Sequence, residues 1–189
     1  VRVSAFVLML RAVTGEEDLI FGTTAAGRHL PGTEAMIGVF VNPLPVRVDL
    51  AGGSGTDEVI RLVEDRLLEF HRWQNYVLAD LIEHVEPFVG KDINETFHAY
   101  ILFQNHPRPE RQGPRTYTVV ETDDLGDQEL AQLRRPHGKL MRDFELIVMA
   151  QPDGEMSLNH WYRQGACTEA QVREWSDVYT SMLHRLLAS

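Results

Sequence analysis

The sequence has 189 residues, the length of one ordinary domain and too short for two full-sized ones. Its 43% hydrophobic residues argue against intrinsic disorder, and its longest nearly apolar stretch, residues 3–10, is far below the roughly 18 residues that a membrane-spanning helix needs. The net charge of −10 disfavours nucleic acid as a partner. The single cysteine excludes an intrachain disulfide and a cysteine-based zinc site, and it is consistent with the reducing cytoplasm. We therefore expect a globular cytoplasmic protein.

The first half of the sequence alternates helices and extended segments. Residues 4–13 are apolar on almost every face, which predicts a buried helix that Gly15 can end in the left-handed conformation. Nothing before Val3 resembles an N-cap, so we expect the sequence to begin inside or just before a helix of a longer parent protein. A short natural protein that has lost its initiator methionine is the alternative. A strand is predicted at 18–24, followed by a loop at 25–32. Residues 39–50 are predicted to be an edge strand or an irregular extended segment, because Pro43 and Pro45 interrupt them.

A turn at 51–55 leads into two helices. Thr56 is predicted to cap the first, whose apolar stripe is Val59, Val63, Leu67 and Phe70, and a short helix follows at 78–84.

The second half is predicted to consist mostly of strands. Residues 96–104 are apolar on both faces, which favours a strand inside the sheet that is covered on two sides. Residues 144–150 and 156–162, with Asp153-Gly154 between them, are typical of a β-hairpin. Thr168 and Gln171 form a capping box for a closing helix. The apolar stripe of that helix is Val172, Trp175, Tyr179, Met182 and Leu186. Between the central strand and the hairpin, residues 106–114 are predicted to be an exposed loop and residues 116–121 a further strand. Residues 126–139 carry no clear pattern.

No catalytic motif is visible. The sequence has no phosphate-binding loop, no dinucleotide-binding glycine pattern, no nucleophile elbow around Ser54, and no His-Glu-x-x-His pair among its eight histidines. Cys167 directly precedes the predicted N-cap of the closing helix, where a thiolate can be stabilised, but it has no evident partner and we expect it to be inert. Composition and periodicity therefore predict an α/β domain without a visible catalytic centre or metal site.

Two segments near the N-terminus carry a more specific signal. Residues 14–28 contain Thr-Gly-Glu-Glu-Asp, a β-prone run and then Gly-Thr-Thr-Ala-Ala-Gly-Arg, and residues 37–47 read Ile-Gly-Val-Phe-Val-Asn-Pro-Leu-Pro-Val-Arg. Their order and spacing resemble the motifs that open the C-terminal half of condensation domains of nonribosomal peptide synthetases. Weaker similarities follow at 74–76, 81–83, 103–105 and 144–146. The resemblance is strong over residues 1–50 and loose thereafter.

The resemblance implies one half of a condensation domain. Such domains consist of two chloramphenicol-acetyltransferase-like halves, each a mixed, mainly antiparallel sheet packed with helices. We therefore expect residues 1–189 to form a single C-terminal subdomain of the α/β (α+β) class, belonging to a domain roughly twice as long. The family's catalytic His-His-x-x-x-Asp-Gly motif lies in the N-terminal half, and no His-His pair occurs in this sequence. The chain alone is expected to be inactive.

The same resemblance gives roles to four residues. It places Arg28 at the interface between the halves, paired with the aspartate of the catalytic motif, since a guanidinium makes a two-pronged contact with a carboxylate. A surface arginine paired within its own loop is the alternative. Asn42 is expected to face the substrate tunnel, where an amide can donate and accept, unless it caps a turn at an edge strand. Gly22 and Thr23 belong to the same tunnel or interface set.

The function implied is amide-bond formation between thioester-tethered aminoacyl or peptidyl groups, with this half supplying a tunnel wall and a docking surface for carrier proteins. Its partners would be the N-terminal subdomain, peptidyl carrier proteins with their phosphopantetheine arms, and neighbouring synthetase domains. No directly bound cofactor, nucleic acid or membrane is expected. An epimerization domain, a domain that recruits tailoring oxygenases and a free-standing binding module are alternatives. Asn-Glu-Thr-Phe at 94–97 replaces the family's Arg-Asp-x-Ser motif, which, with Trp73 and Val77, favours a specialised relative.

A half-domain exposes surface that its partner would bury. The first helix is apolar nearly all round, and large apolar patches are uncommon on monomers. We therefore expect an exposed apolar face and self-association of the isolated chain.

Overall fold

The structure, a computed structural model, describes residues 1–33, 35–51, 55–86, 88–89, 97–104, 143–150, 156–163 and 165–188. Its helices are α1 (Arg2–Thr14), α2 (Thr56–Arg72), α3 (Leu78–His84) and α5 (Glu169–Ala188), and its strands are β1 (Asp18–Ala25), β2 (Asn42–Asp49), β3 (Ala99–Gln104), β4 (Phe144–Ala150) and β5 (Met156–Tyr162). The helices and strands predicted within these residues are confirmed, but β2 begins at Asn42 instead of residue 39, and β3 begins at Ala99 instead of residue 96. The loop at 106–114, the strand at 116–121, the segment at 126–139 and the turn at Asp153-Gly154 lie outside the described residues.

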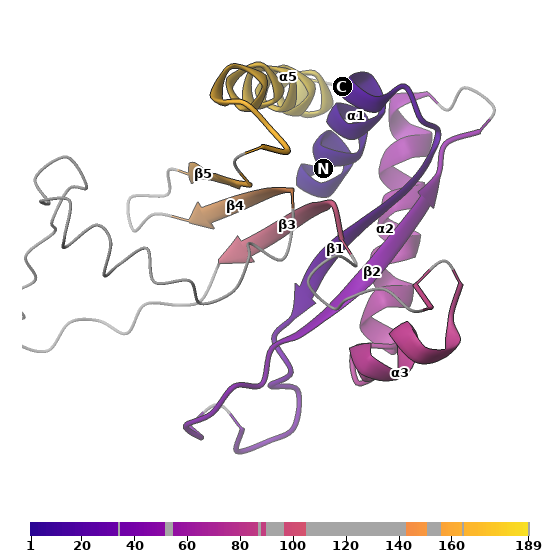
Figure 1. Cartoon of the computed structure of the whole chain (residues 1–189), viewed down its shortest axis with the longest axis vertical. Coiled ribbons are helices and arrows are strands. Elements are labelled where there is room, and N and C mark those ends of the chain that lie inside the picture. The colour runs from indigo at the N-terminus through magenta and orange to yellow at the C-terminus, as the bar shows by residue number, and fades with distance from the viewer. Residues whose placement is uncertain are drawn as a thin grey trace, which may run out of the picture.

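Within the described residues, five strands form one mixed sheet in the order β2-β1-β3-β4-β5 (Figure 1). The pairs β1–β2 and β4–β5 are antiparallel, whereas β1–β3 and β3–β4 are parallel. The mixed sheet is as expected, and most of its paired residues belong to the two antiparallel pairs. β2 lies at the sheet edge, which agrees with its two prolines, because a proline cannot donate a ladder hydrogen bond. β3 lies in the centre, where the side chains of Tyr100 and Ile101 are both fully buried.

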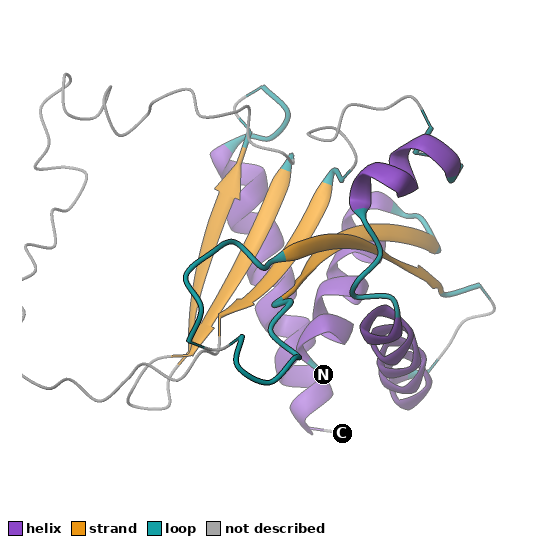
Figure 2. Ribbon diagram, turned by 90° about the horizontal axis from the view of Figure 1, so that it is seen from below, coloured by secondary structure: helices purple, strands orange, loops and turns teal. Residues whose placement is uncertain are grey.

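Helices α1, α2 and α5 cover one face of the sheet and enclose the main core (Figure 2). The side chains of Phe6 and Met9 on α1 are fully buried, and α1 packs chiefly against α5. The ring of Phe6 stands edge-on to that of Phe21 on β1, with centroids 5.5 Å apart. The almost uniformly apolar α1 is therefore covered within this chain and is not the exposed face expected of a half-domain.

A smaller cluster covers part of the opposite face, where α3 packs beside β2 and reaches the ring of Tyr100 on β3. Its members are Leu78, Leu81, Phe88, Phe97 and Tyr100. Tyr100 lies directly on the backbone of Gly22 in the neighbouring strand, and a Cβ at Gly22 would stand 2.5 Å from Tyr100 Cε2 and 2.8 Å from Phe97 Cγ. Gly22 therefore has no side chain because two aromatic rings occupy that space.

The helix ends follow local chemistry, with one correction. Gly15 ends α1 at φ 75° and donates its N–H to the carbonyl of Arg11. Thr168 and Gln171 form the predicted capping box of α5: the Thr168 N–H donates to Gln171 Oε1 over 2.9 Å, and the Gln171 N–H donates to Thr168 Oγ1 over 3.3 Å. The predicted cap of α2 is wrong, because Gly55 is its N-cap and Thr56 is its first helical residue. No helix in the described ranges is both long and apolar enough to cross a membrane.

Candidate functional site

The loop between β1 and β2 carries Arg28, which binds within that loop. Its guanidinium donates to the carbonyl oxygens of Thr33, of Met36 at 3.0 Å and of Gly38 at 3.2 Å. The guanidinium carbon also stands 4.2 Å from the centroid of the Phe40 ring. No carboxylate of a described residue pairs with it. The guanidinium thus shapes the loop through neutral acceptors and a cation–π contact.

The same loop exposes an apolar run, which we call the arm (residues 36–41). The side chains of Ile37 and Val39 are 104% and 90% exposed, and those of Met36 and Val41 are more than half exposed. Arg28 binds two carbonyls of this run and so holds it in an extended course away from the core. The expected exposed apolar face is therefore present, on the arm instead of α1. Figure 1 shows this loop as the purple segment that projects beyond the ends of β1 and β2.

The other three predicted site residues have partners inside the fold. Asn42 donates through Nδ2 to the carbonyls of Gln74 and Tyr76, at 2.9 and 2.7 Å, and so joins the start of β2 to the connection between α2 and α3. Thr23 is buried, and its hydroxyl donates to the Ile101 carbonyl at 2.8 Å. Gly22 lies beneath Tyr100. The structure thus brings Arg28 and Asn42 to the two ends of one loop, while Gly22 and Thr23 join β1 to β3.

Sequence reasoning missed a groove of about 670 Å³ along the free edge of β2. Its walls are α2 and α3, and its floor is the outer edge of β2. Trp73 stands beside it with a side chain that is 61% exposed. Two of its charged side chains are in ion pairs: Arg66 with Glu69 at 2.8 Å, and Arg47 with Asp18 through two hydrogen bonds of 2.7 and 2.8 Å. The Asp49 carboxylate accepts the Ala51 N–H at 2.9 Å. The one available signal was an aromatic residue placed between two helices next to a proline-bearing edge strand.

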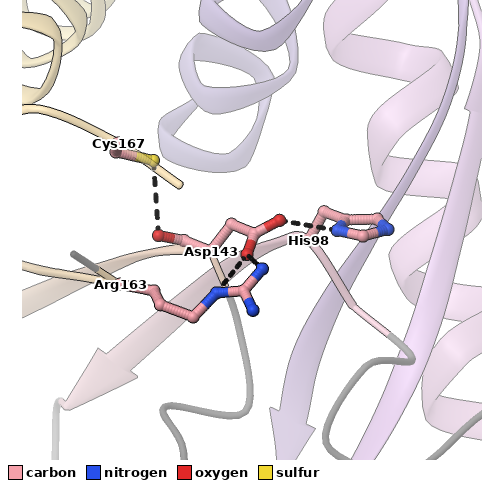
Figure 3. A network of polar contacts seen from close by, with 4 residues as sticks. All are labelled: His98, Asp143, Arg163 and Cys167. Carbon is pink, nitrogen blue, oxygen red and sulfur yellow. Dashed lines mark hydrogen bonds and ion pairs between the residues drawn. The ribbon is translucent and has the colours of Figure 1, made fainter. Parts of the chain in front are cut away.

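A polar network at the opposite end of the sheet centres on Asp143 (Figure 3). Its Oδ2 stands 2.7 Å from His98 Nδ1, and its Oδ1 accepts from Arg163 Nε at 2.8 Å. Burial raises the pKa of Asp143, but the hydrogen bonds from His98 and Arg163 outweigh burial and the net pKa is lowered. The Cys167 thiol donates to the Asp143 carbonyl at 3.4 Å, and burial and the Asp143 charge raise its pKa. The thiol therefore stays protonated, which fits an inert cysteine.

The condensation domain family accounts for the whole of this chain. The sequence model of that family, described as "Condensation domain", matches residues 1–189. The chain belongs to the condensation domain family. Among curated relatives it is 25% identical over 186 residues to a linear gramicidin synthase protein of Brevibacillus parabrevis, and 24% identical over 190 residues to a plipastatin synthase protein of Bacillus subtilis (strain 168). These alignments cover 97% and 100% of this chain.

Solved structures show that the condensation domain fold extends over the chain. The first condensation domain of the calcium-dependent antibiotic synthetase, in complex with a substrate analogue, superposes with a TM-score of 0.71 at 14% identity and covers 99% of this chain. A four-domain nonribosomal peptide synthetase bound to AMP and glycine superposes with a TM-score of 0.73 at 16% identity and also covers 99%. The match spans 38% and 14% of those chains, and 2% and 7% of the two curated relatives.

Proposed function

We propose that this chain is the C-terminal, non-catalytic half of a nonribosomal peptide synthetase condensation domain. The observation that carries the proposal is one of coverage: 99% of the chain matches only 38% of a solved condensation domain. The sequence also contains no His-His pair that could supply the family's catalytic motif. On this proposal, the general base and its orienting groups belong to the other half, and this chain supplies surfaces.

The arm is the surface that would meet the other half. Burial of a fully exposed valine or isoleucine side chain contributes about 1.5–3 kcal/mol, so Ile37 and Val39 are strong anchors for such an interface. A guanidinium has five N–H donors, and Arg28 uses three hydrogen bonds on its own loop. On this proposal its remaining donors would bind the carboxylate that the resemblance implies. Arg28 would thus hold the arm and receive the opposite half.

The tunnel wall and the carrier docking surface form the second part of the proposal. An acceptor amine attacks a thioester in this reaction, and tethering both reactants in one tunnel replaces a bimolecular encounter with a positioned one. Both N–H groups of the Asn42 amide are used on the carbonyls of Gln74 and Tyr76, so its Oδ1 is left to accept a hydrogen bond from a group in the tunnel. Phosphopantetheine arms of carrier proteins would deliver the substrates, in the cytoplasm, and no cofactor would bind this chain directly.

Reconstitution tests the proposal. The purified chain is incubated with loaded donor and acceptor carrier proteins, alone and with a separately produced N-terminal half that carries the His-His-x-x-x-Asp-Gly motif. We expect no amide product by mass spectrometry from the chain alone and product when the intact half is added. The matched control is the same half with both histidines changed to alanine. Amide formed by the chain alone would contradict the proposal, and no product with the intact half would favour the recruitment or epimerization alternative.

A further inference from the structure

Among the described residues, β2 pairs with β1 alone, and the backbone groups of its other edge face the groove. The Leu50 N–H donates to the Glu17 carbonyl at 2.8 Å, which sets the alternation of the β1–β2 pair. Even-numbered residues of β2 therefore bond to β1, and the N–H and C=O groups of odd-numbered residues point outward. Pro43 and Pro45 have no N–H, so the outward donors are those of Arg47 and Asp49.

The groove around this edge fits an uncharged extended segment. It is lined by residues of α2 and α3 together with the edge strand β2, so an extended segment that lies along β2 would contact both helices. Its lining is mostly apolar, and its charged residues, two arginines and two acidic residues, balance one another, so the lining offers no net charge to a charged partner. The outward backbone N–H and C=O groups of Arg47 and Asp49 are the groups to which an added strand would bind.

The arm has the chemistry that this groove requires. Its sequence, Met-Ile-Gly-Val-Phe-Val, is neutral and rich in residues that favour strands. Arg28 binds the carbonyls of Met36 and Gly38, so in an extended course the backbone N–H and C=O groups of the alternate residues Ile37 and Val39 point to the other edge, where a strand can pair with them. The arm cannot fill the groove of its own chain, because it runs directly into β2 at Asn42 and a hairpin needs at least about two loop residues. An arm that enters the groove therefore belongs to another molecule.

We propose that two copies of this chain form a reciprocal dimer, in which the arm of each copy enters the groove of the other as a sixth strand beside β2. Ten of the fifteen exposed large apolar side chains in the described part of the chain lie at 30–41 and 73–89, which are the arm, its loop and the groove surroundings. Together they expose on the order of 1,000 Å², above the roughly 800 Å² per partner that a stable interface buries. The groove is complete only when the second copy contributes its arm.

This dimer competes with the proposed assembly of the two halves, because the arm cannot serve both. A protein that contains both halves is therefore expected to be monomeric. If such a protein still dimerises through the arm, the arm's role in the proposed function fails and the dimer stands. If the 189-residue chain does not dimerise, the dimer fails and the proposed function is unaffected.

Sedimentation equilibrium over a range of concentrations tests the dimer. We expect the chain to sediment as a dimer, and Ile37→Asp to raise the dissociation constant by about tenfold or more. The substitution leaves folding intact because the side chain is fully exposed, which circular dichroism verifies. Leu187→Asp, on the exposed surface of α5, is the matched control and should leave the constant unchanged. A monomer at all concentrations, or an Ile37→Asp variant that dimerises like the parent, would overturn the proposal.

Disulfide trapping then tests which surfaces meet. Val39→Cys on the arm and Val85→Cys at the groove are produced separately, mixed and oxidised; the native Cys167 is buried. The arm-in-groove dimer predicts a mixed disulfide between the two variants. It predicts none when Leu187→Cys replaces Val85→Cys. Disulfides that form only between two Val39→Cys chains would show arm-to-arm contact and overturn the proposal.

Discussion

Gly22→Ala is the most direct test of how the two faces of the sheet are joined. The new Cβ would stand 2.5 Å from Tyr100 Cε2 and 2.8 Å from Phe97 Cγ, distances at which a neighbour must move. Neither ring can move into solvent, because Tyr100 is fully buried and Phe97 is 4% exposed. Overpacking a core costs typically 1–3 kcal/mol, and contacts with two confined rings place this substitution at the upper end, about 3 kcal/mol.

Equilibrium unfolding measures this cost. For a domain of this size 1 kcal/mol shifts Tm by about 2–4 °C, so we expect Gly22→Ala to lower Tm by roughly 6–12 °C. Urea titrations followed by circular dichroism give the free energy of unfolding independently of the thermal melt. A loss below about 0.5 kcal/mol, the range of an ordinary surface substitution, would refute the close packing of Tyr100 on Gly22.

Tyr100→Leu supplies the matched control through a double-mutant cycle. Alone it is destabilising, because it removes a buried ring and the hydroxyl that bonds to Thr24. In the Gly22→Ala background the smaller side chain makes room for the new methyl group. The double variant should therefore lose at least about 1 kcal/mol less than the two single losses added together. Strict additivity would show that the two residues do not compete for the same space.

Three further predictions concern the loop, the polar network and α5. Arg28→Ala should lower the free energy of unfolding by less than about 1 kcal/mol, because water can satisfy the carbonyls of an exposed loop. Thermolysin should nevertheless cleave the arm of this variant faster than that of the parent. A loss of more than about 2 kcal/mol in the free energy of unfolding would contradict this prediction. The lowered pKa of Asp143 contributes stability that is present above the unfolded value, about 3.9, and is lost as pH falls through the folded value. Asp143→Asn should therefore flatten the dependence of the unfolding free energy on pH below about 5, and parallel curves for the two proteins would refute this. Thr168→Ala should cost about 1 kcal/mol in urea unfolding, whereas Thr180→Ala, within the same helix, should stay within about 0.5 kcal/mol; equal effects would show that the capping box contributes nothing.

Local features of the sequence predicted the local structure well. The bounds of β4 and β5 were predicted to the residue, because two β-prone runs flank an Asp-Gly pair. The end of α1 at Gly15 and the capping box of α5 were predicted because each depends on residues within one helical turn. The Thr56 cap failed for a related reason: Gly55 and Thr56 are both acceptable N-caps, and local preference does not choose between them. The position of β2 at the sheet edge followed from its prolines alone.

The candidate site needed more than local information. The family resemblance selected Arg28 and Asn42 through motif spacing, but their partners in the structure are carbonyls of Gly38 and Tyr76, ten and 34 residues further along the chain. Composition and periodicity carry no signal for such partners, because a carbonyl acceptor is present at every residue. The groove was missed because its walls, α2 and α3, pack on opposite sides of one strand edge. The amphipathic pattern of a helix shows which of its faces is buried, but it does not show which element that face contacts.

Sequence by itself therefore determined the type and order of the elements, the family and the absence of a His-His pair, because these depend on residue identity and short-range spacing. Only the tertiary structure decided that β1 lies beside β3, so that Gly22 receives the ring of Tyr100, and that His98 meets Asp143 across 45 residues. It also decided that the apolar α1 is covered while the arm is exposed. Such contacts join residues that are remote in sequence, and they exist only once strand order, register and helix placement have been chosen together by the packing of the core.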